Sequence, residues 1–376
     1  MPTARMSSPD RSRRLRAGGA RSGRRPEGSR PDPRRPAEAA GPAAAGPAGP
    51  HAAGPQAAGQ GWATPYHAPV LAAETVAHLV TSPGSGSGAG PDGVYIDGTL
   101  GGGGHAAALL AALGPGARVV GIDRDAEARA EATARIGDPR FTAVAGTFAD
   151  MEALAASLGI RAGTVAGVLL DLGISSHQVD DAGRGFAFSA DGPLDMRMNG
   201  GAGETAAELI ARLDADGLAD VIYAYGEERR SRRVARAILA AERMATTADL
   251  AAAVRSAVPA RDELKTLARV FQALRIAVND EIGQIERALP AALRLLAPGG
   301  RLAVIAYHSL EDRRAKRFLR HGHFGAEPRK DAFGRVLSPL RAVTRRPVVA
   351  GAAETAANPR ARSARLRVAE RLGDAL

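Results

Sequence analysis

The amino-acid sequence predicts an α/β fold, in which a helical insertion interrupts a doubly wound, mostly parallel sheet. Between residues 94 and 171, short apolar strands alternate with segments of helical periodicity. The alternation then stops for more than a hundred residues of helical pattern, and an apolar strand follows the turn at Pro298. Strands that alternate with helices form right-handed crossovers, which place the strands parallel in one sheet.

The individual elements follow from the spacing of apolar residues. Short apolar runs indicate strands at 94–97, 118–123, 141–145 and 165–171. Helical spacing indicates connecting helices at 105–113, 126–136 and 151–158. Within the interruption, helical spacing covers 205–213, 216–225, 230–243, 247–257 and 264–296. The sheet pattern then resumes with a strand ending at 306, a helix at 310–320 and a final strand at 364–369.

The N-terminal segment differs in composition from the rest of the chain. Residues 1–61 are rich in Arg, Pro, Gly, Ala and Ser and lack hydrophobic periodicity, which predicts a disordered tail. The tail has 11 arginines and four carboxylates, so it carries +7 of the formal charge of +10. The remainder is only mildly basic, and a nucleic-acid partner has to be argued from local clusters. We expect residues 62–177 and 285–376 to form one domain, with 178–284 inserted as a helical domain.

Composition excludes several classes of protein. The chain has no cysteine, which rules out disulfides, thiolate metal sites and a cysteine nucleophile. No run of residues approaches the roughly 18 apolar residues of a membrane span, and the N-terminus lacks the apolar segment of a secretory signal. We therefore expect a cytoplasmic protein without membrane contact, and we predict no metal site.

A glycine-rich run from Tyr95 to His105 joins the first predicted strand to the first predicted helix. Glycines there permit positive φ and a close approach of the backbone to a ligand, at the edge where doubly wound sheets bind nucleotides. The run also satisfies a dinucleotide fingerprint, and Asp123, at the end of the next strand, could bind ribose hydroxyls in either case. Asp97 favours S-adenosylmethionine, because its carboxylate would attract the ammonium group of that ligand and repel a pyrophosphate.

Candidate catalytic residues follow two later strands. Asp171 ends the fourth strand and Ser175 follows it, while His308 comes directly after the fifth strand. The carboxyl ends of parallel strands meet at one edge of the sheet, so these groups would face the reactive end of the cofactor. Each could accept hydrogen from an amine during methyl transfer. The alternatives are that the serine caps a turn, that Asp171 binds cofactor alone, and that His308 contacts RNA.

Two arginine-rich segments could contact phosphates. They are 227–236, within the predicted insertion, and 358–365, near the C-terminus. The alternative is a solvated helix face and a strand edge protected by charge.

The chain resembles the bacterial 16S rRNA (cytosine-N4)-methyltransferase family from about Tyr66 to its end. The matching motifs are His67-Ala-Pro-Val-Leu71 with Glu74, Tyr95 to His105, Gly121-Ile-Asp-Arg-Asp125, Leu170 to Gln178, Asp180-Asp181, Arg184-Gly-Phe-Ala-Phe188, Asp191-Gly-Pro-Leu-Asp-Met-Arg-Met198, Tyr225-Gly-Glu-Glu-Arg229, Phe271-Gln-Ala-Leu-Arg275 with Asn279, Pro298-Gly-Gly-Arg301, His308-Ser-Leu-Glu-Asp-Arg313 and Asn358 to Arg365.

This resemblance implies a Rossmann-like class I methyltransferase core with an inserted helical domain that helps to bind RNA. It implies methyl transfer from S-adenosyl-L-methionine to N4 of a cytidine in the decoding region of 16S rRNA, with 16S rRNA or the small ribosomal subunit as partner. The cofactor contacts that it implies are Gly103, Gly104, His105, Asp123, Phe148, Asp171 and Gln178. A dinucleotide-dependent oxidoreductase and an RNA-binding module with a decayed transferase site are the competing hypotheses. The sequence leaves the oligomeric state open, with a dimer as the one candidate.

Overall fold

The computed structural model describes residues 69–80, 90–174, 179–199, 201–325, 327, 330–334 and 336–373. The predicted tail at 1–61 lies outside these residues, as do Ser175 and Gln178. Within the described part of the chain, no helix is long and apolar enough to cross a membrane.

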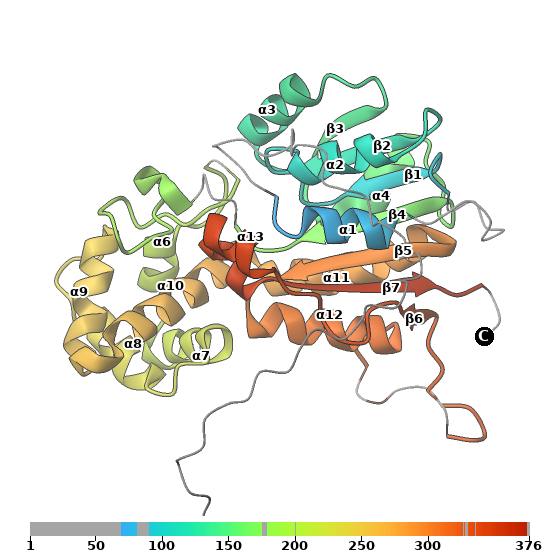
Figure 1. The fold of residues 1–376 in the computed structure, drawn as a ribbon. Helices are drawn as coiled ribbons and strands as arrows, with labels where there is room; N and C mark the ends of the chain where they lie inside the picture. The colour runs from blue at the N-terminus through green and yellow to red at the C-terminus, as the bar shows by residue number, and fades with distance from the viewer. Residues whose placement is uncertain are drawn as a thin grey trace, which may run out of the picture. The chain divides into compact units, whose positions relative to one another are not determined.

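A seven-stranded sheet forms the centre of the described structure, with strand order β3-β2-β1-β4-β5-β7-β6 (Figure 1). The strands are β1 (Val94–Asp97), β2 (Arg118–Asp123), β3 (Phe141–Ala145), β4 (Val165–Asp171), β5 (Leu296–Ala306), β6 (Leu340–Ala342) and β7 (Arg365–Arg371). Strands β1 to β5 pair in parallel, and β7 pairs antiparallel with both β5 and β6. The mostly parallel sheet and the interrupted strand–helix alternation are confirmed.

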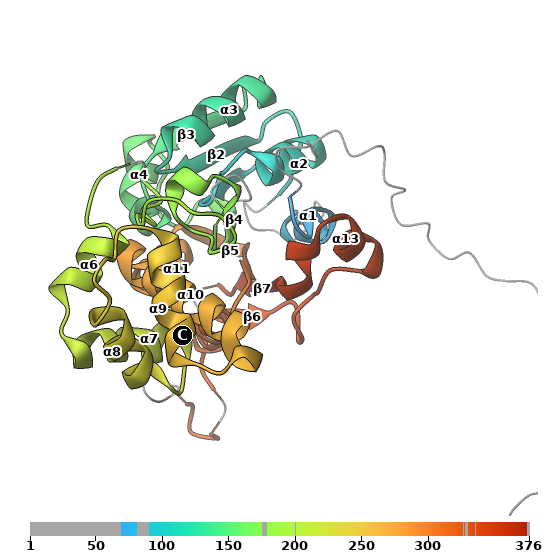
Figure 2. The same ribbon diagram turned by 90° about the vertical axis from the view of Figure 1, so that its left-hand side faces the viewer.

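Helices cover both faces of the sheet because alternate strand residues point to opposite sides. Tyr95 belongs to the apolar cluster under α1 (Ala72–Leu79) and α2 (Gly104–Ala112), whereas its neighbour Ile96 belongs to the cluster under α4, α11 and α12. The bounds of those helices are α4 (Met151–Ser157), α11 (Glu281–Leu295) and α12 (Ser309–His321). Figure 2 shows α1 and α4 on opposite sides of the strands. Helix α3 (Ala126–Ile136) packs beside β2 and β3.

The segment between β4 and β5 is helical, as predicted. It contains α6 (Ala206–Arg212), α7 (Ala215–Gly226), α8 (Ser231–Leu239), α9 (Thr247–Ala257) and α10 (Glu263–Asn279). Most of these helices enclose a separate apolar cluster that runs from Phe186 to Leu274, and Figure 1 shows them gathered beside the sheet. The C-terminal end of α10 and all of α11 pack into the main core instead. The division of the chain at 178 and 284 stays a prediction.

One predicted helix is wrong in its extent. The sequence pattern predicts a single helix over 264–296, but the chain breaks into α10 and α11 at Asp280, whose φ of 48° is left-handed. Asn279 stabilises the break, because its side-chain oxygen accepts from the Met198 backbone N–H at 2.9 Å and its amide donates to the Met196 carbonyl at 2.8 Å. Asn and Asp tolerate the left-handed region better than other non-glycine residues. The Asn279-Asp280 pair was therefore the feature of the sequence that could have indicated the helix break.

Strand register places the candidate groups at one edge. Asp97 pairs with Gly121 of β2 and with Leu169 of β4, and Asp171 pairs with Ile305 of β5. The residues directly after β1, β2, β4 and β5 therefore emerge on the same side of the sheet, where the site is built.

Candidate functional site

The glycine-rich run forms a tight turn between β1 and α2. Gly101 and Gly103 have φ values of 47° and 74°, in the region that glycine enters without steric cost. A Cβ on Gly103 would lie 2.9 Å from the Cβ of Ala132 in α3, so glycine also permits close helix packing there. The predicted cofactor residues Gly103 and Gly104 thus end the turn and begin α2, beneath the surface of the loop.

Asp97 lies fully buried at the end of β1. Its Oδ1 accepts from the Thr99 backbone N–H at 3.1 Å, while its Oδ2 has no hydrogen-bond partner in the described residues. Burial raises the pKa of Asp97 to about 6, against the opposing effects of His105 and of the Thr99 hydrogen bond. At neutral pH this carboxylate is therefore mostly ionised, and its field favours a cation close to the loop.

His105, the second residue of α2, is buried and neutral. Its Nε2 lies 2.9 Å from the Val70 carbonyl, and burial lowers the pKa of the imidazole. A carbonyl can only accept, so Nε2 carries the proton and Nδ1 keeps its lone pair. Nδ1 lies 3.6 Å from Asp171 Oδ2, which places two acceptors face to face and disfavours ionisation of Asp171.

Asp123 ends β2 and closes the turn from the other side. Its Oδ2 accepts from the Gly101 N–H at 2.9 Å, and its Oδ1 accepts from the Asp125 N–H at 2.9 Å. A carboxylate has about four lone-pair positions, so two remain for hydroxyl donors of a ligand. Phe148, in the 3₁₀ turn Phe148–Asp150 after β3, lies half-buried beside the same space.

The ends of β4 and β5 join Asp171 to Tyr307. The Tyr307 hydroxyl donates to Asp171 Oδ1 at 2.9 Å, and the Asp171 backbone N–H donates to Thr99 Oγ1 at 2.6 Å. Burial raises the pKa of Asp171 to about 7, even though the Tyr307 hydrogen bond opposes this change. Burial and the adjacent carboxylate raise the pKa of Tyr307 well above its ordinary value, so Tyr307 stays a donor.

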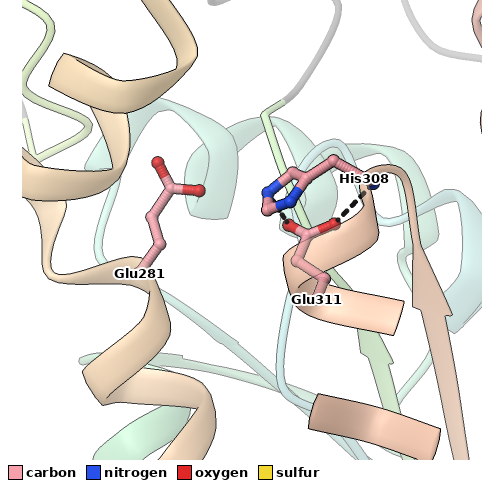
Figure 3. A group of neighbouring side chains, drawn as sticks. All are labelled: Glu281, His308 and Glu311. Atoms are coloured by element: carbon pink, nitrogen blue, oxygen red, sulfur yellow. Dashed lines mark hydrogen bonds and ion pairs between the residues drawn. The ribbon is translucent and has the colours of Figure 1, made fainter. Parts of the chain in front are cut away.

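His308 lies beside a buried group of charges (Figure 3). Its Nε2 is 3.1 Å from Glu311 Oε1, while Glu311 Oε2 accepts from the backbone N–H groups of Tyr307 and His308 at 2.8 and 3.2 Å. Burial would raise the pKa of Glu311, but the contact with His308 and the charge of Arg275 outweigh it, and the pKa is lowered. Glu311 therefore fixes the turn that presents both Tyr307 and His308.

Glu281, His308 and Glu311 are close enough together to ligate a metal ion, with their ligand atoms within 4.8 Å of one another. Figure 3 shows the Glu281 side chain directed toward the other two. Arg275, however, donates to both Glu281 oxygens at 2.8 and 2.9 Å, and the charge of Arg124 also acts on Glu281. Arg275 thus occupies both Glu281 oxygens, and its charge also acts on Glu311, so we assign no metal to this cluster.

These groups surround one cleft of about 360 Å³. It brings together the predicted residues Asp123, Phe148, Asp171 and His308. Asp97, Gly103, Gly104 and His105 lie beneath its wall, and Ser175 and Gln178 fall outside the described residues. Among the lining residues for which the sequence suggested no individual role are Thr99, Gln272, Arg275, Gln284 and Tyr307. The position of Tyr307 next to His308, just past a strand, was the signal that could have identified it.

The C-terminal arginine segment closes one side of the cleft. Asn358, Arg360 and Ser363, from the turn at Pro359–Ser363 and the residue before it, line the space. Arg360 lies 2.7 Å from Asp180, so it ties this turn to the chain that follows β4.

The chain is similar to known proteins over most of its length. The family model described as the MraW methylase family matches residues 64–372. A "Ribosomal RNA small subunit methyltransferase H" of Sorangium cellulosum (strain So ce56) is 53% identical over 317 residues, which are 82% of this chain and 92% of that protein. A protein of the same name from Acidiphilium cryptum (strain JF-5) is 49% identical over 318 residues, 81% of this chain and 97% of that protein. Among solved structures, an rRNA methylase from Streptococcus thermophilus aligns over 80% of this chain and 95% of that one, with 11% identity and a TM-score of 0.35.

Proposed function

This chain belongs to the MraW methylase family and is an S-adenosylmethionine-dependent rRNA methyltransferase, and we propose that it methylates N4 of a cytidine in the decoding region of 16S rRNA. The observation that carries the proposal is the Asp171–Tyr307 pair, which lies beside His308 in the cleft that Asp123 also lines. The relatives act, by name, on the small-subunit ribosomal RNA. Because such a substrate is ribosomal RNA, we also propose a cytoplasmic location.

The residues around the cleft suit S-adenosylmethionine. Asp97 keeps a buried carboxylate oxygen without a hydrogen-bond partner in the described residues, which favours the ammonium group of this cofactor over a pyrophosphate. Asp123 retains lone pairs for the two ribose hydroxyls, and Phe148 offers an apolar ring face for adenine. Gly103, Gly104 and His105 form and support the turn beneath. Gln178 remains a proposed contact from the family resemblance.

When bound, S-adenosylmethionine supplies an electrophilic methyl group on a sulfonium centre. The exocyclic amine of cytosine is a weak nucleophile, because its lone pair is delocalised into the ring. As the N–C bond forms and the C–S bond breaks, one amine proton has to leave. Asp171 is the proposed acceptor of that proton, since the Tyr307 hydroxyl occupies Oδ1 and no described residue donates to Oδ2.

His308 is the second proposed catalytic residue, and Ser175 remains the third from its place after β4. The His308 ring borders the cleft, and its Nε2 faces Glu311, so the buried Nδ1, which has no hydrogen-bond partner in the described residues, is the nitrogen proposed to accept a hydrogen bond from the target base. Chemistry on an exocyclic amine requires an unstacked base, so the enzyme has to take an open or single-stranded segment of RNA. We assign residues 62–177 and 285–376 to the methyltransferase domain and 178–284 to an RNA-binding insertion.

The test uses enzyme, methyl-labelled cofactor and small ribosomal subunits, followed by digestion of the RNA and separation of nucleosides. Label in N4-methylcytidine is the expected result. The His308→Ala variant should lower turnover about 10²-fold or more while calorimetry finds its affinity for the cofactor retained. His78→Ala, on α1 and outside the cleft, is the matched control. Label confined to C5-methylcytidine, to a ribose-methylated nucleoside or to protein would contradict the proposal.

A further inference from the structure

Helix α8 exposes a group of arginines outside the cleft. Its buried face consists of Ser231, Val234, Ala235 and Ile238, which pack into the insertion. Its opposite face carries Arg232, Arg233 and Arg236, and Arg229 precedes the helix; all four side chains are exposed. We call these four residues the α8 arginine patch.

The patch differs from the rest of the insertion in its charge pairing. The eight other arginines between residues 201 and 290 each lie 2.6 to 3.8 Å from a carboxylate, namely Arg212, Arg230, Arg243, Arg255, Arg261, Arg269, Arg275 and Arg287. No ion pair joins an arginine of the patch to any carboxylate of the described chain. If the patch were an ordinary solvated helix face, we would expect its arginines to form ion pairs with carboxylates, as the other arginines of this region do. Three arginines of the patch on one turn and a half of helix, with Arg229 just before it, repel one another and favour an anionic partner.

An aromatic side chain lies next to the patch. Tyr223, near the end of α7, is 62% exposed and lines a shallow hollow together with Arg229, Arg232, Arg233 and Arg236. Asp220 also borders the hollow but forms an ion pair with none of them. Proteins hold single-stranded nucleic acid by positive charges that contact its phosphates and by aromatic rings that stack on its bases. The arginines and the exposed tyrosine ring supply both features side by side.

We propose that the α8 arginine patch and Tyr223 form a second RNA-contacting surface, which holds the phosphate backbone of the substrate outside the catalytic cleft. The proposal rests on the proposed function, because the RNA held there is the one whose cytidine enters the cleft. The hollow between α7 and α8, two helices of the insertion in Figure 1, shares no lining residue with the catalytic cleft. A segment held at both places has to extend beyond the target nucleotide, so a short oligonucleotide around that nucleotide would miss the second surface.

The experiment compares two double variants with the same loss of charge. Arg232→Gln/Arg233→Gln alters the patch, and Arg212→Gln/Arg255→Gln removes two exposed arginines of the same insertion that are paired to Glu204 and Glu263. The probe is a protein-free transcript of small-subunit ribosomal RNA, and its binding is measured by fluorescence anisotropy at several salt concentrations. Each phosphate contact contributes about 0.7 to 0.9 to the salt slope.

The patch variant should lose about 1.4 to 1.8 of the slope of log K against log salt, which corresponds to roughly 25- to 60-fold weaker binding at 0.1 M salt. The control variant should keep the slope of the unaltered protein. Tyr223→Ala should weaken binding about fivefold or more with an unchanged slope, since stacking carries no charge. Melting temperatures of all variants, which change exposed side chains, should match the parent.

Two results would overturn the proposal. The first is a patch variant whose affinity and slope equal those of the control variant. The second is a patch variant that binds the transcript normally but assembled small subunits weakly, because a ribosomal protein would then be the partner. The nucleoside formed in the methylation assay is a separate measurement, so failure of the N4-cytidine assignment would be distinguished from failure of this surface.

Discussion

Replacing Tyr307 by phenylalanine tests the proposed role of Asp171 through its protonation. The change removes the hydroxyl that donates to Asp171 Oδ1 at 2.9 Å and keeps the ring that packs in the cleft wall. The pKa of Asp171 is about 7 in the unaltered protein, so about half of the enzyme has the ionised, proton-accepting form at pH 7. Loss of the donor raises that pKa, because the ionised form loses more stabilisation than the neutral acid.

The size of the effect follows from the strength of the lost hydrogen bond. A hydrogen bond to a charged group contributes about 1.5 to 3 kcal/mol, or roughly 10- to 150-fold in the balance between ionised and protonated Asp171. Turnover at pH 7 should therefore fall roughly 7- to 80-fold, and it should recover as the pH rises. The acid limb of the rate profile moves to higher pH.

The assay measures methyl transfer to small ribosomal subunits at saturating cofactor between about pH 6 and 9.5. Tyr95→Phe is the matched control, because it removes a hydroxyl that donates to the Gly90 carbonyl at 3.2 Å, outside the cleft. A Tyr307→Phe profile that is lowered equally at every pH, with its acid limb in place, would refute the reasoning that ionised Asp171 accepts the proton.

Three further changes test other parts of the structure. Asp123→Ala should weaken cofactor binding by on the order of 2–4 kcal/mol, since two charge-assisted hydrogen bonds to ribose are lost; unchanged calorimetric affinity would remove Asp123 from the site. Phe318→Ala should lower the free energy of unfolding by about 3–5 kcal/mol in denaturant titrations, because its ring is fully buried between α12 and the sheet. A loss under about 1 kcal/mol would contradict that packing. Deletion of residues 1–61 should leave the melting temperature nearly unchanged, as expected for a tail of that composition, and a large drop would show that it packs on the core.

Much of the sheet could be predicted because its central strands β1, β2, β4 and β5 are mostly buried. The strands at 118–123 and 165–171 coincide with the predicted bounds, since their continuous apolar runs are almost fully buried. The edge strand at 141–145 and the helix at 126–136 also coincide with the predicted bounds, although few of their residues are buried. The short strand Leu340–Ala342 was missed, because three residues at a sheet edge, with only the first buried, give no periodic signal.

The site was predictable where it depends on strand ends and not where it depends on contacts between distant segments. Asp123 and Asp171 stand at the ends of strands, which topology alone brings to one edge. The bond between Asp171 and Tyr307 joins residues 136 positions apart, and it exists because β4 and β5 are neighbours although the insertion separates them in sequence. Glu311 was not singled out, although its contact is local: it follows His308 by three residues and accepts from the backbone N–H groups of Tyr307 and His308 as part of a capping box.

The nucleosides of small-subunit ribosomal RNA, taken from a strain that lacks this protein, test the central claim most directly. N4-methylcytidine from the decoding region should disappear in that strain and return when the unaltered chain is supplied. It should stay absent when the strain instead carries Asp171→Asn, at an equal protein level. An unchanged amount of N4-methylcytidine in the deletion strain, or full restoration by the Asp171→Asn chain, would contradict the account.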